Sequence, residues 1–188
     1  MTGRLETRLA EIGVTLPDAP APAANYVPHV RVGDLLHVSG QISMDAEGGL
    51  IRGKLGDGLW VEEGAAAARR CAIALLAQVR AACDGDLDRL VRAVKLTGFV
   101  NSVPDFTDQP KVINGASDFL LEALGDAGRH ARSAVSAASL PLGVAVEIEP
   151  QTRLIPCSAP SSITVSSALR PSPWPFRPEA SETANSAL

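Results

Sequence analysis

The chain has 188 residues, of which 46% are hydrophobic and 20% are charged. This balance is that of an ordinary globular protein with enough apolar side chains for a buried core. The formal net charge is −4 at pH 7, which argues against a nucleic-acid-binding protein, because such proteins gather Lys and Arg on a basic surface. An acidic chain can still bind an anionic metabolite through a local cation.

The three cysteines, Cys71, Cys83 and Cys157, are odd in number and widely spaced, which argues against a disulfide framework or a zinc site. We therefore expect reduced thiols and a cytoplasmic location. The first residues lack the apolar run of a signal peptide, and no stretch is long and apolar enough to span a membrane. The three histidines are scattered without metal-ligand spacing, so no metal site is expected.

Residues 1–25 are predicted to form an N-terminal helix followed by a connector. In residues 3–13 the apolar side chains recur on one stripe, as in a short amphipathic helix that ends at Gly13. Residues 16–25 are rich in proline and alanine, which indicates an extended segment.

Residues 27–43 are predicted to form two strands that meet at Gly33-Asp34. Alternation in the second strand puts four residues on one face, Leu36, Val38, Gly40 and Ile42. It puts the intervening residues on the other face, Leu35, His37, Ser39 and Gln41. Residues 44–60 are rich in Gly and Asp, so a loop with a short strand at 50–54 is expected.

Two long helices follow this loop. The clearer one is residues 61–83, where alanine dominates and acidic residues stand in the first turn. The remaining elements are expected to be a strand at 91–102, a helix at 111–125, and strands at 133–138 and 143–150. The last strand is expected to be interrupted at Pro150, because proline cannot donate a hydrogen bond to a ladder.

The resulting order, β-β-(β)-α-β-α-β-β, predicts an α+β fold with a mixed sheet and two long helices on one face. The face expected under the helices carries Val38, Ile42, Val94, Leu96, Val144, Val146 and Ile148. The other face is expected to mix polar and apolar side chains, namely Ser39, Gln41, Lys95, Thr97, Glu147 and Glu149 with Leu35, Phe99 and Ala145. Such a face is either wet or covered by another subunit, and we favour a subunit.

The last residues, 156–188, are rich in Ser, Pro and Ala and have no apolar period, which predicts a disordered tail. Trp174 and Phe176 are isolated aromatic residues there, and the alternative is that they dock on a neighbour. The folded domain is therefore expected to be residues 26–155.

No strong catalytic signature is present, such as a G-x-S-x-G, a P-loop, an H-E-x-x-H or a C-x-x-C. The most suggestive pair is Arg132, where a loop enters a strand, and Glu147, on the mixed face of the next strand. A guanidinium can hold a carboxylate through two parallel hydrogen bonds, and a carboxylate can position or deprotonate a water. Together they would suit hydrolysis of a small acid with a C=N group; the alternative is an ion pair between neighbouring strands.

Several short pieces occur together in a characteristic order, namely Tyr26, Val38-Ser39-Gly40-Gln41-Ile42, Asn114, Ala131-Arg132-Ser133, Leu140-Pro141 and Val146-Glu147-Ile148-Glu149. They cover residues 25–150 and resemble the RidA/YjgF family of reactive intermediate deaminases, also called endoribonuclease L-PSP-like proteins. Longer phrases such as residues 96–101 and 128–135 are similar to a longer, less characterised branch whose members also carry the N-terminal helix.

The resemblance implies a chorismate-mutase-like α+β fold and a homotrimer with clefts between subunits. It also implies hydrolysis of enamines and imines to 2-keto acids and ammonia, as by a 2-iminobutanoate/2-iminopropanoate deaminase, without metal or cofactor. Arg132 matches the arginine that grips the substrate carboxylate, and Glu147 matches the carboxylate associated with the attacking water. Other cleft positions of the family correspond to Tyr26, Ser39, Asn114 and Ala134 in this sequence. Ala134 stands where many deaminases have Cys, a position that contributes mainly through its backbone.

Two other functions stay open at this point. The same cleft would serve a non-catalytic trimer that binds a carboxylate metabolite or acts as an interaction module. The older family name suggests RNA cleavage or translation inhibition, but the chain is acidic and has no basic and aromatic residues interleaved for stacking on single-stranded RNA. The resemblance implies that the partner is a small carboxylate-bearing substrate.

Overall fold

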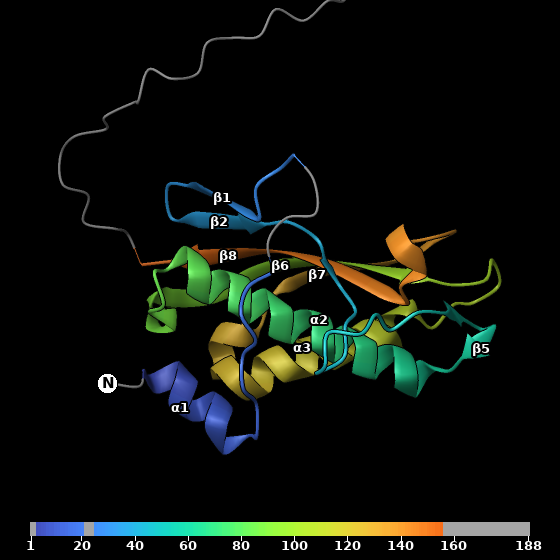
Figure 1. The fold of residues 1–188 in the computed structure, drawn as a ribbon, viewed down its shortest axis with the longest axis horizontal. Helices are drawn as coiled ribbons and strands as arrows, with labels where there is room; N and C mark the ends of the chain where they lie inside the picture. The colour runs from blue at the N-terminus through green and yellow to red at the C-terminus, as the bar shows by residue number, and fades with distance from the viewer. Residues whose placement is uncertain (1–2, 21–24, 156–188) are drawn as a thin grey trace, which may run out of the picture. The chain divides into compact units, whose positions relative to one another are not determined.

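The computed structural model describes residues 3–20 and 25–155 (Figure 1). The tail predicted at residues 156–188 therefore lies outside the described residues. The helices are α1 (Arg4–Glu11), α2 (Val61–Ala82) and α3 (Gln109–Leu124), with short 3₁₀ turns η1 (Leu87–Arg89), η2 (Gly125–Gly128) and η3 (Pro141–Gly143). The strands are β1 (His29–Val32), β2 (Leu35–Val38), β3 (Gln41–Ile42), β4 (Lys54–Leu55), β5 (Gly58–Leu59), β6 (Leu90–Asn101), β7 (Ala131–Ala137) and β8 (Val146–Leu154).

The main sheet has six strands in the order β1-β2-β8-β6-β7, with β3 also paired to β8. β6 and β7 are parallel, and the other pairs of this sheet are antiparallel. β4 and β5 form a separate small pair in the loop where one short strand was expected. α2 and α3 lie together against one face of the sheet, and α1 lies beyond them (Figure 1). The predicted α+β arrangement with two long helices on one face is confirmed.

The two long helices approach each other closely because small residues line their contact. α2 buries Ala67, Ala68 and Ala72, which bring its backbone near its neighbours. Gly115 of α3 lies against the backbone carbonyl of Ala65, and a Cβ atom at that glycine would overlap with the carbonyl oxygen. Close helix packing of this kind gives the core its density.

The N-terminal helix joins the same core. Leu5 and Leu9 of α1 are buried. The Asp88 carboxylate in η1 accepts the backbone N–H groups of Leu5 and Arg4, at 2.8 and 2.7 Å. These two hydrogen bonds, the one from Leu5 most strongly, lower the pKa of Asp88 and satisfy donors that the first helical turn leaves free.

β8 runs through Pro150 to Leu154, so the prediction that this strand is interrupted at Pro150 is wrong. The amides of Val146 and Leu154 both point toward the side of β2 and β3. The two-residue alternation of a strand places the nitrogen of Pro150 on the same side. The β2–β3 side has a bulge at Ser39-Gly40, which leaves a gap in its hydrogen-bond ladder with β8. The N–H that Pro150 lacks would have pointed into this gap.

This bulge follows from the register of β8 with its two partners. β2 pairs His37 with Gln151, and β3 pairs Gln41 with Ile148. Between these pairs the β2–β3 side has one residue more than β8. An extra residue in one strand of an antiparallel pair is a β-bulge, and it bends and twists the bulged strand locally.

The bulge reverses the faces of the residues that follow it. Gln41 is buried opposite Ile148 in the core, and Ile42 lies opposite Glu147. Both placements are the reverse of the predicted ones, because the prediction assumed an unbroken alternation. The Gln41 Nε2 donates to the carbonyl oxygen of Ser39 at 2.9 Å, so this buried amide holds the bulge together.

Two further predictions about faces are wrong. The register of β6 on β8 shifts between Ala93 and Lys95, which leaves Val94 unpaired on β8 and only half-buried. Ala145 is fully buried rather than on the mixed face, and its amide donates to the carbonyl of Ile51. The other residues predicted for the helix-covered face are buried, namely Val38, Leu96, Val144, Val146 and Ile148.

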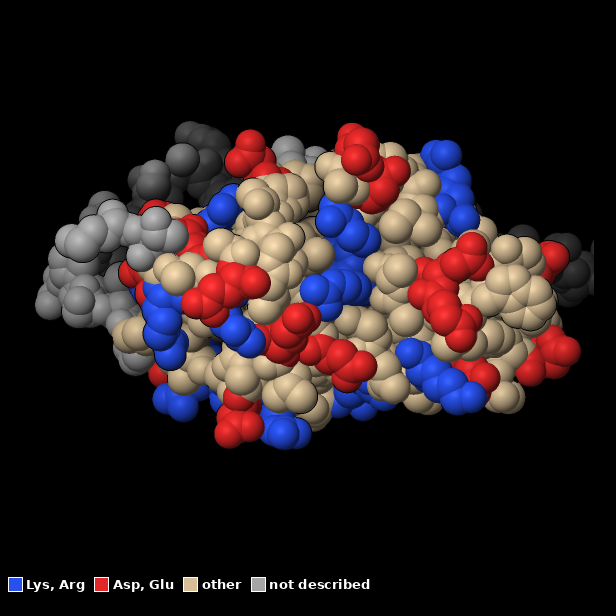
Figure 2. All heavy atoms as spheres, turned by 90° about the horizontal axis from the view of Figure 1, so that it is seen from below, with Lys and Arg blue, Asp and Glu red and all other residues tan. Residues whose placement is uncertain are grey.

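The sheet face opposite the helices is mixed, as predicted. It exposes apolar side chains beside charged ones, namely Val30, Val32, Leu35 and Val135 with Lys95 and Glu149. The outward face of the helix layer differs, because acidic and basic side chains are interspersed across it (Figure 2). Ion pairs such as Arg69–Glu122 and Lys111–Asp108 belong to these helices.

Replacing Gly115 by Ala tests the close contact of α2 with α3. The added methyl group meets the backbone of Ala65, which cannot rotate away, so the helices must separate. Overpacking of this kind costs typically about 1–3 kcal/mol, and the melting temperature should fall accordingly. Asp118→Ala, at an exposed position of the same helix, is the control. Equal melting temperatures for the two variants would contradict the contact.

Candidate active site

Glu147 lies on the open face of β8, beside the bulge. Its cross-strand partners are Ile42 on β3 and Phe99 on β6. Its carboxylate lies so close over Gly40 that a Cβ atom there would overlap with it. Burial, with a smaller contribution from the charge of Glu149, raises the pKa of Glu147 above its usual value. A carboxylate whose pKa is raised is a stronger base than an exposed one, which suits it to accept and return a proton.

A cavity of about 530 Å³ opens beside this carboxylate. Its wall is mostly apolar and includes Ile42 and Met44 after the bulge and Ala74 of α2. Apolar cavities with a few convergent polar groups are the usual form of small-molecule sites. The cavity therefore offers room for an apolar part of a ligand next to the Glu147 carboxylate.

Tyr26 and Ser39, which the sequence analysis selected, also line this cavity. The Ser39 hydroxyl donates to the carbonyl oxygen of Val27 at 2.8 Å, so it ties the chain that follows Tyr26 to the bulge. Tyr26 is 51% exposed. Glu147, Ser39 and Tyr26 thus form one polar rim, which we call the carboxylate half-site.

Arg132 belongs to a second group, at the start of β7. β7 is an edge strand of the sheet. The Arg132 Nη1 donates to Asn114 Oδ1 at 2.8 Å and to Ser117 Oγ at 3.1 Å, both on α3. Ala134 follows two residues later, on the same side of β7, and packs partly on the core. We call Arg132, Asn114 and Ser117 with Ala134 the guanidinium half-site.

The two half-sites are separate within one chain. β6 lies between β7 and β8. Arg132 pairs with Leu96 of β6, which is in the core, whereas Glu147 pairs with Phe99, which is on the open face. Because paired residues share a face, the two side chains point to opposite faces of the sheet. The alternative of an Arg–Glu ion pair between neighbouring strands is therefore wrong.

Behind Arg132 stand two polar residues, Ser117 and His130, that were not among the predicted site residues. Ser117 Oγ lies 3.1 Å from His130 Nε2, and His130 Nδ1 lies 2.6 Å from the carbonyl oxygen of Gly128. His130 could have been found from the sequence, because it stands two residues before Arg132 and residues two apart in an extended chain lie on the same side. Nothing in the sequence alone pointed to Ser117.

Within residues 3–20 and 25–155, no group of three or more His, Cys, Asp and Glu side chains is placed to hold a metal ion. None of the helices in this part of the chain is long and apolar enough to cross a membrane. Cys71 and Cys83 are buried free thiols, and burial raises the pKa of each. Both thiols are thus kept in their unreactive, protonated form.

The family model described as "YjgF/chorismate mutase-like, putative endoribonuclease" matches residues 6–148. The chain belongs to the RidA/YjgF family. Protein TCP17 of Trypanosoma cruzi is 52% identical over 149 residues, which cover 79% of this chain and 92% of TCP17. The crystal structure of Atu1372 from Agrobacterium tumefaciens is 47% identical, with a TM-score of 0.74, over 80% of this chain and 92% of that one. The Escherichia coli YjgF gene product is 32% identical, with a TM-score of 0.54, over 72% and 93% of the two chains.

Membership of the RidA/YjgF family confirms the predicted chorismate-mutase-like fold. The Agrobacterium protein matches more of this chain, and with a higher TM-score, than the Escherichia coli protein does. This difference agrees with a longer branch of the family. None of these similarities by itself assigns a reaction to the chain.

Replacing Glu147 by Gln tests the desolvation of this carboxyl group. The raised pKa means that the folded chain binds the proton more tightly than the unfolded chain. Stability therefore decreases as the pH rises from the pKa of Glu147 in the unfolded chain through its pKa in the folded chain. The Glu147→Gln variant has no carboxyl group to ionise at this position, so it does not undergo this decrease in stability. The variant should melt at a higher temperature than the wild type at about pH 8 and show little difference at about pH 4. Thermal unfolding at both pH values measures this.

The control for the loss of one negative charge is Glu62→Gln, at an exposed position in the first turn of α2. A gain of Glu147→Gln that is the same at both pH values, or a loss of stability at the higher pH, would contradict the assigned desolvation. The measurement needs no substrate, so it remains informative whatever the reaction is.

Proposed function

We propose that this chain hydrolyses reactive enamines and imines to 2-keto acids and ammonia in clefts between the subunits of a homotrimer. The observation that carries this proposal is the separation of the two half-sites. Arg132 lies at an edge strand and Glu147 on a face that the helices leave open. A neighbouring copy can therefore bring the guanidinium half-site of one subunit to the carboxylate half-site of the next.

Arg132 is the group that would bind the substrate carboxylate. Only its Nη1 has hydrogen-bond partners among the described residues, and both are neutral side chains of α3. No acidic side chain in the described part of the chain therefore neutralises the charge, and the remaining N–H groups can form a two-point contact with a carboxylate. We keep the cytoplasm as the proposed location of this reaction, because the three cysteines are too few and too widely spaced for a disulfide framework.

Glu147 is the group that would move the proton. An enamine first becomes an imine when its carbon takes up a proton and its nitrogen releases one. Water then adds to the C=N carbon, Glu147 accepts a proton from that water, and this proton passes to the nitrogen, which gives a carbinolamine. Glu147 then takes the proton of the carbinolamine hydroxyl and passes it to the nitrogen, the C–N bond breaks with its electron pair on nitrogen, and ammonia and the 2-keto acid leave. Burial raises the pKa of Glu147, so its carboxylate is a stronger base than an exposed one, which suits it to take a proton from water and return it.

A non-catalytic protein that binds a carboxylate metabolite would use the same guanidinium half-site. An assay of keto-acid release from freshly generated 2-aminoacrylate and from branched-chain imines separates the two functions. Turnover by the wild type that is lost in Arg132→Ala supports hydrolysis. Binding of a 2-keto acid without turnover supports the alternative. An RNA substrate receives no support from the acidic net charge of −4.

Mixed trimers test whether the site is shared between subunits. Arg132→Ala and Glu147→Gln are each expected to be inactive alone. In a mixed trimer one cleft combines the intact arginine of one subunit with the intact glutamate of the other. Random assembly of equal amounts should restore about a quarter of the wild-type activity, because about three quarters of the trimers are mixed and each has one intact cleft in three.

Co-expression with two different tags gives these mixed trimers, and keto-acid release measures their activity. Mixing Arg132→Ala with the double variant Arg132→Ala/Glu147→Gln is the control and should restore nothing. Light scattering on the wild type should report a trimer. Stable monomers, or mixed trimers without any recovery, would overturn the shared site.

Arg132→Lys tests the two-point contact. The substitution keeps the positive charge but removes the planar pair of donors. Turnover of dilute substrate, measured as kcat/KM, should fall at least ~10-fold, because charge-assisted hydrogen bonds are worth roughly 1.5–3 kcal/mol and ~1.4 kcal/mol is a factor of ten. The melting temperature should change little, since the side chain is exposed. A lower melting temperature with unchanged turnover per folded molecule would show that Arg132 has only a structural role.

A further inference from the structure

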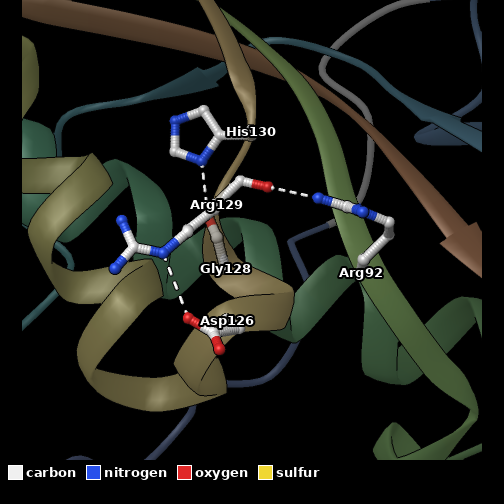
Figure 3. A network of polar contacts seen from close by, with 5 residues as sticks. All are labelled: Arg92, Asp126, Gly128, Arg129 and His130. Atoms are coloured by element: carbon white, nitrogen blue, oxygen red, sulfur yellow. Dashed lines mark hydrogen bonds and ion pairs between the residues drawn. The ribbon is translucent and has the colours of Figure 1, made fainter.

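A chain of hydrogen bonds runs from Arg132 to the backbone of η2. The Arg132 Nη1 lies 3.1 Å from Ser117 Oγ, and Ser117 Oγ lies 3.1 Å from His130 Nε2. The Nδ1 of His130 lies 2.6 Å from the carbonyl oxygen of Gly128 (Figure 3). These contacts join three segments, because Ser117 is on α3, Gly128 ends η2, and Arg132 is on β7.

The chemistry of the partners fixes where the protons are. A carbonyl oxygen only accepts, so Nδ1 of His130 carries a hydrogen. In a neutral imidazole the other nitrogen, Nε2, is then an acceptor, and the Ser117 hydroxyl donates to it. The lone pairs of Ser117 Oγ are left for the N–H of Arg132, which can only donate. Every group in the chain thus donates to the next one, from Arg132 to Gly128.

We propose that His130 and Ser117 position the guanidinium of Arg132 for the substrate carboxylate. Asn114 and Ser117 hold one nitrogen, Nη1, against α3. These two hydrogen bonds restrict the orientation of the planar group, and they leave its other nitrogens without a partner among the described residues. His130 fixes the Ser117 hydroxyl so that its proton does not compete with the N–H of Arg132. The proposal rests on the proposed function only for the identity of the bound carboxylate.

The surroundings of the ring favour its neutral form. Burial, and after it the positive charge of Arg132, lower the pKa of His130, while the contact with Gly128 acts in the opposite direction. The segments around the ring carry four other charged residues, namely Arg129 next to it in the sequence, Asp126 in η2, Arg92 on β6 and Asp118 on α3. The Arg129 guanidinium pairs with Asp126 at 3.1 Å, and Arg92 donates to the Arg129 carbonyl at 2.9 Å. Figure 3 shows this pair turned away from the imidazole.

Two substitutions break the chain at different links. His130→Phe removes both ring nitrogens, and Ser117→Ala removes the hydroxyl that joins His130 to Arg132. In both variants KM for the imine should rise about tenfold with little change in kcat, because a carboxylate contact made equally in ground and transition states affects KM. His130→Gln keeps an amide acceptor near the Nε2 position and should restore most of the affinity. A merely structural histidine would not show this rescue.

The matched control is Arg129→Ala. Arg129 is adjacent to His130 in the sequence, but its side chain pairs with Asp126 and not with Arg132. Its KM should equal that of the wild type. Unchanged KM in both His130→Phe and Ser117→Ala, with an active wild type, would overturn the positioning role and leave the proposed function intact.

Two measurements on the full chain do not need turnover. Calorimetric titration with 2-oxobutanoate should show about tenfold weaker binding in Ser117→Ala than in the wild type. Nitrogen NMR of the histidine rings should show the proton of His130 on Nδ1, with an Nε2 resonance that shifts in Ser117→Ala. A wild type that binds 2-oxobutanoate without turnover would end the proposed function, whereas weaker binding in Ser117→Ala would still support the positioning role. A His130 ring protonated on Nε2 would overturn that role in either case.

Discussion

Two helices cover only one face of the sheet, and the functional arrangement depends on this one-sided packing. Small residues let α2 and α3 approach so closely that Gly115 touches the backbone of Ala65. The pair therefore fills one face without spreading to the other. Val30, Val32 and Val135 stay exposed on the uncovered face, and burying apolar surface is worth about 25 cal/mol per Å². A second copy of the chain gains this free energy when it covers the face, which supports the proposed trimer.

Pro150 and the carboxylate half-site are linked through the bulge. A proline in a central strand leaves one ladder position without a donor, and the bulge at Ser39-Gly40 lies at that position. The bulge turns Gln41 inward to hold the carbonyl of Ser39. It also leaves Gly40 under the Glu147 carboxylate, where a larger residue would displace it. The bulge interrupts the hydrogen bonds of the sheet, and it also creates the space in which the Glu147 carboxyl group lies.

The helices and the order of the elements could be predicted from the sequence because their signals are local. The alanine-rich stretch at 61–83 and the apolar period at 111–125 correspond to α2 (Val61–Ala82) and α3 (Gln109–Leu124). The bulges could not be predicted, because a period of two assumes an unbroken ladder. The errors at Gln41, Ile42 and Val94 all come from that assumption.

The relation of Arg132 to Glu147 was outside the reach of the sequence for a different reason. Strands that follow each other in the chain need not be neighbours in the sheet, and β6 entered between β7 and β8. The family resemblance had pointed to individual residues of both half-sites, and their roles stay predictions. Ser117 was missed because its role depends on where α3 lies against β7, which is a tertiary contact without a local signal.

The separation of the half-sites has a chemical consequence. If the guanidinium of Arg132 and the carboxylate of Glu147 were neighbours in one chain, their ion pair would compete with the carboxylate of the substrate and lower the pKa of Glu147. Because they lie on different strands and faces, Arg132 has no acidic partner within residues 3–20 and 25–155, and Glu147 keeps a raised pKa. In a cleft between subunits, the two groups would lie far enough apart for a substrate and a water between them. The substrate would then supply the anion that Arg132 lacks, and Glu147 would remain available for the proton.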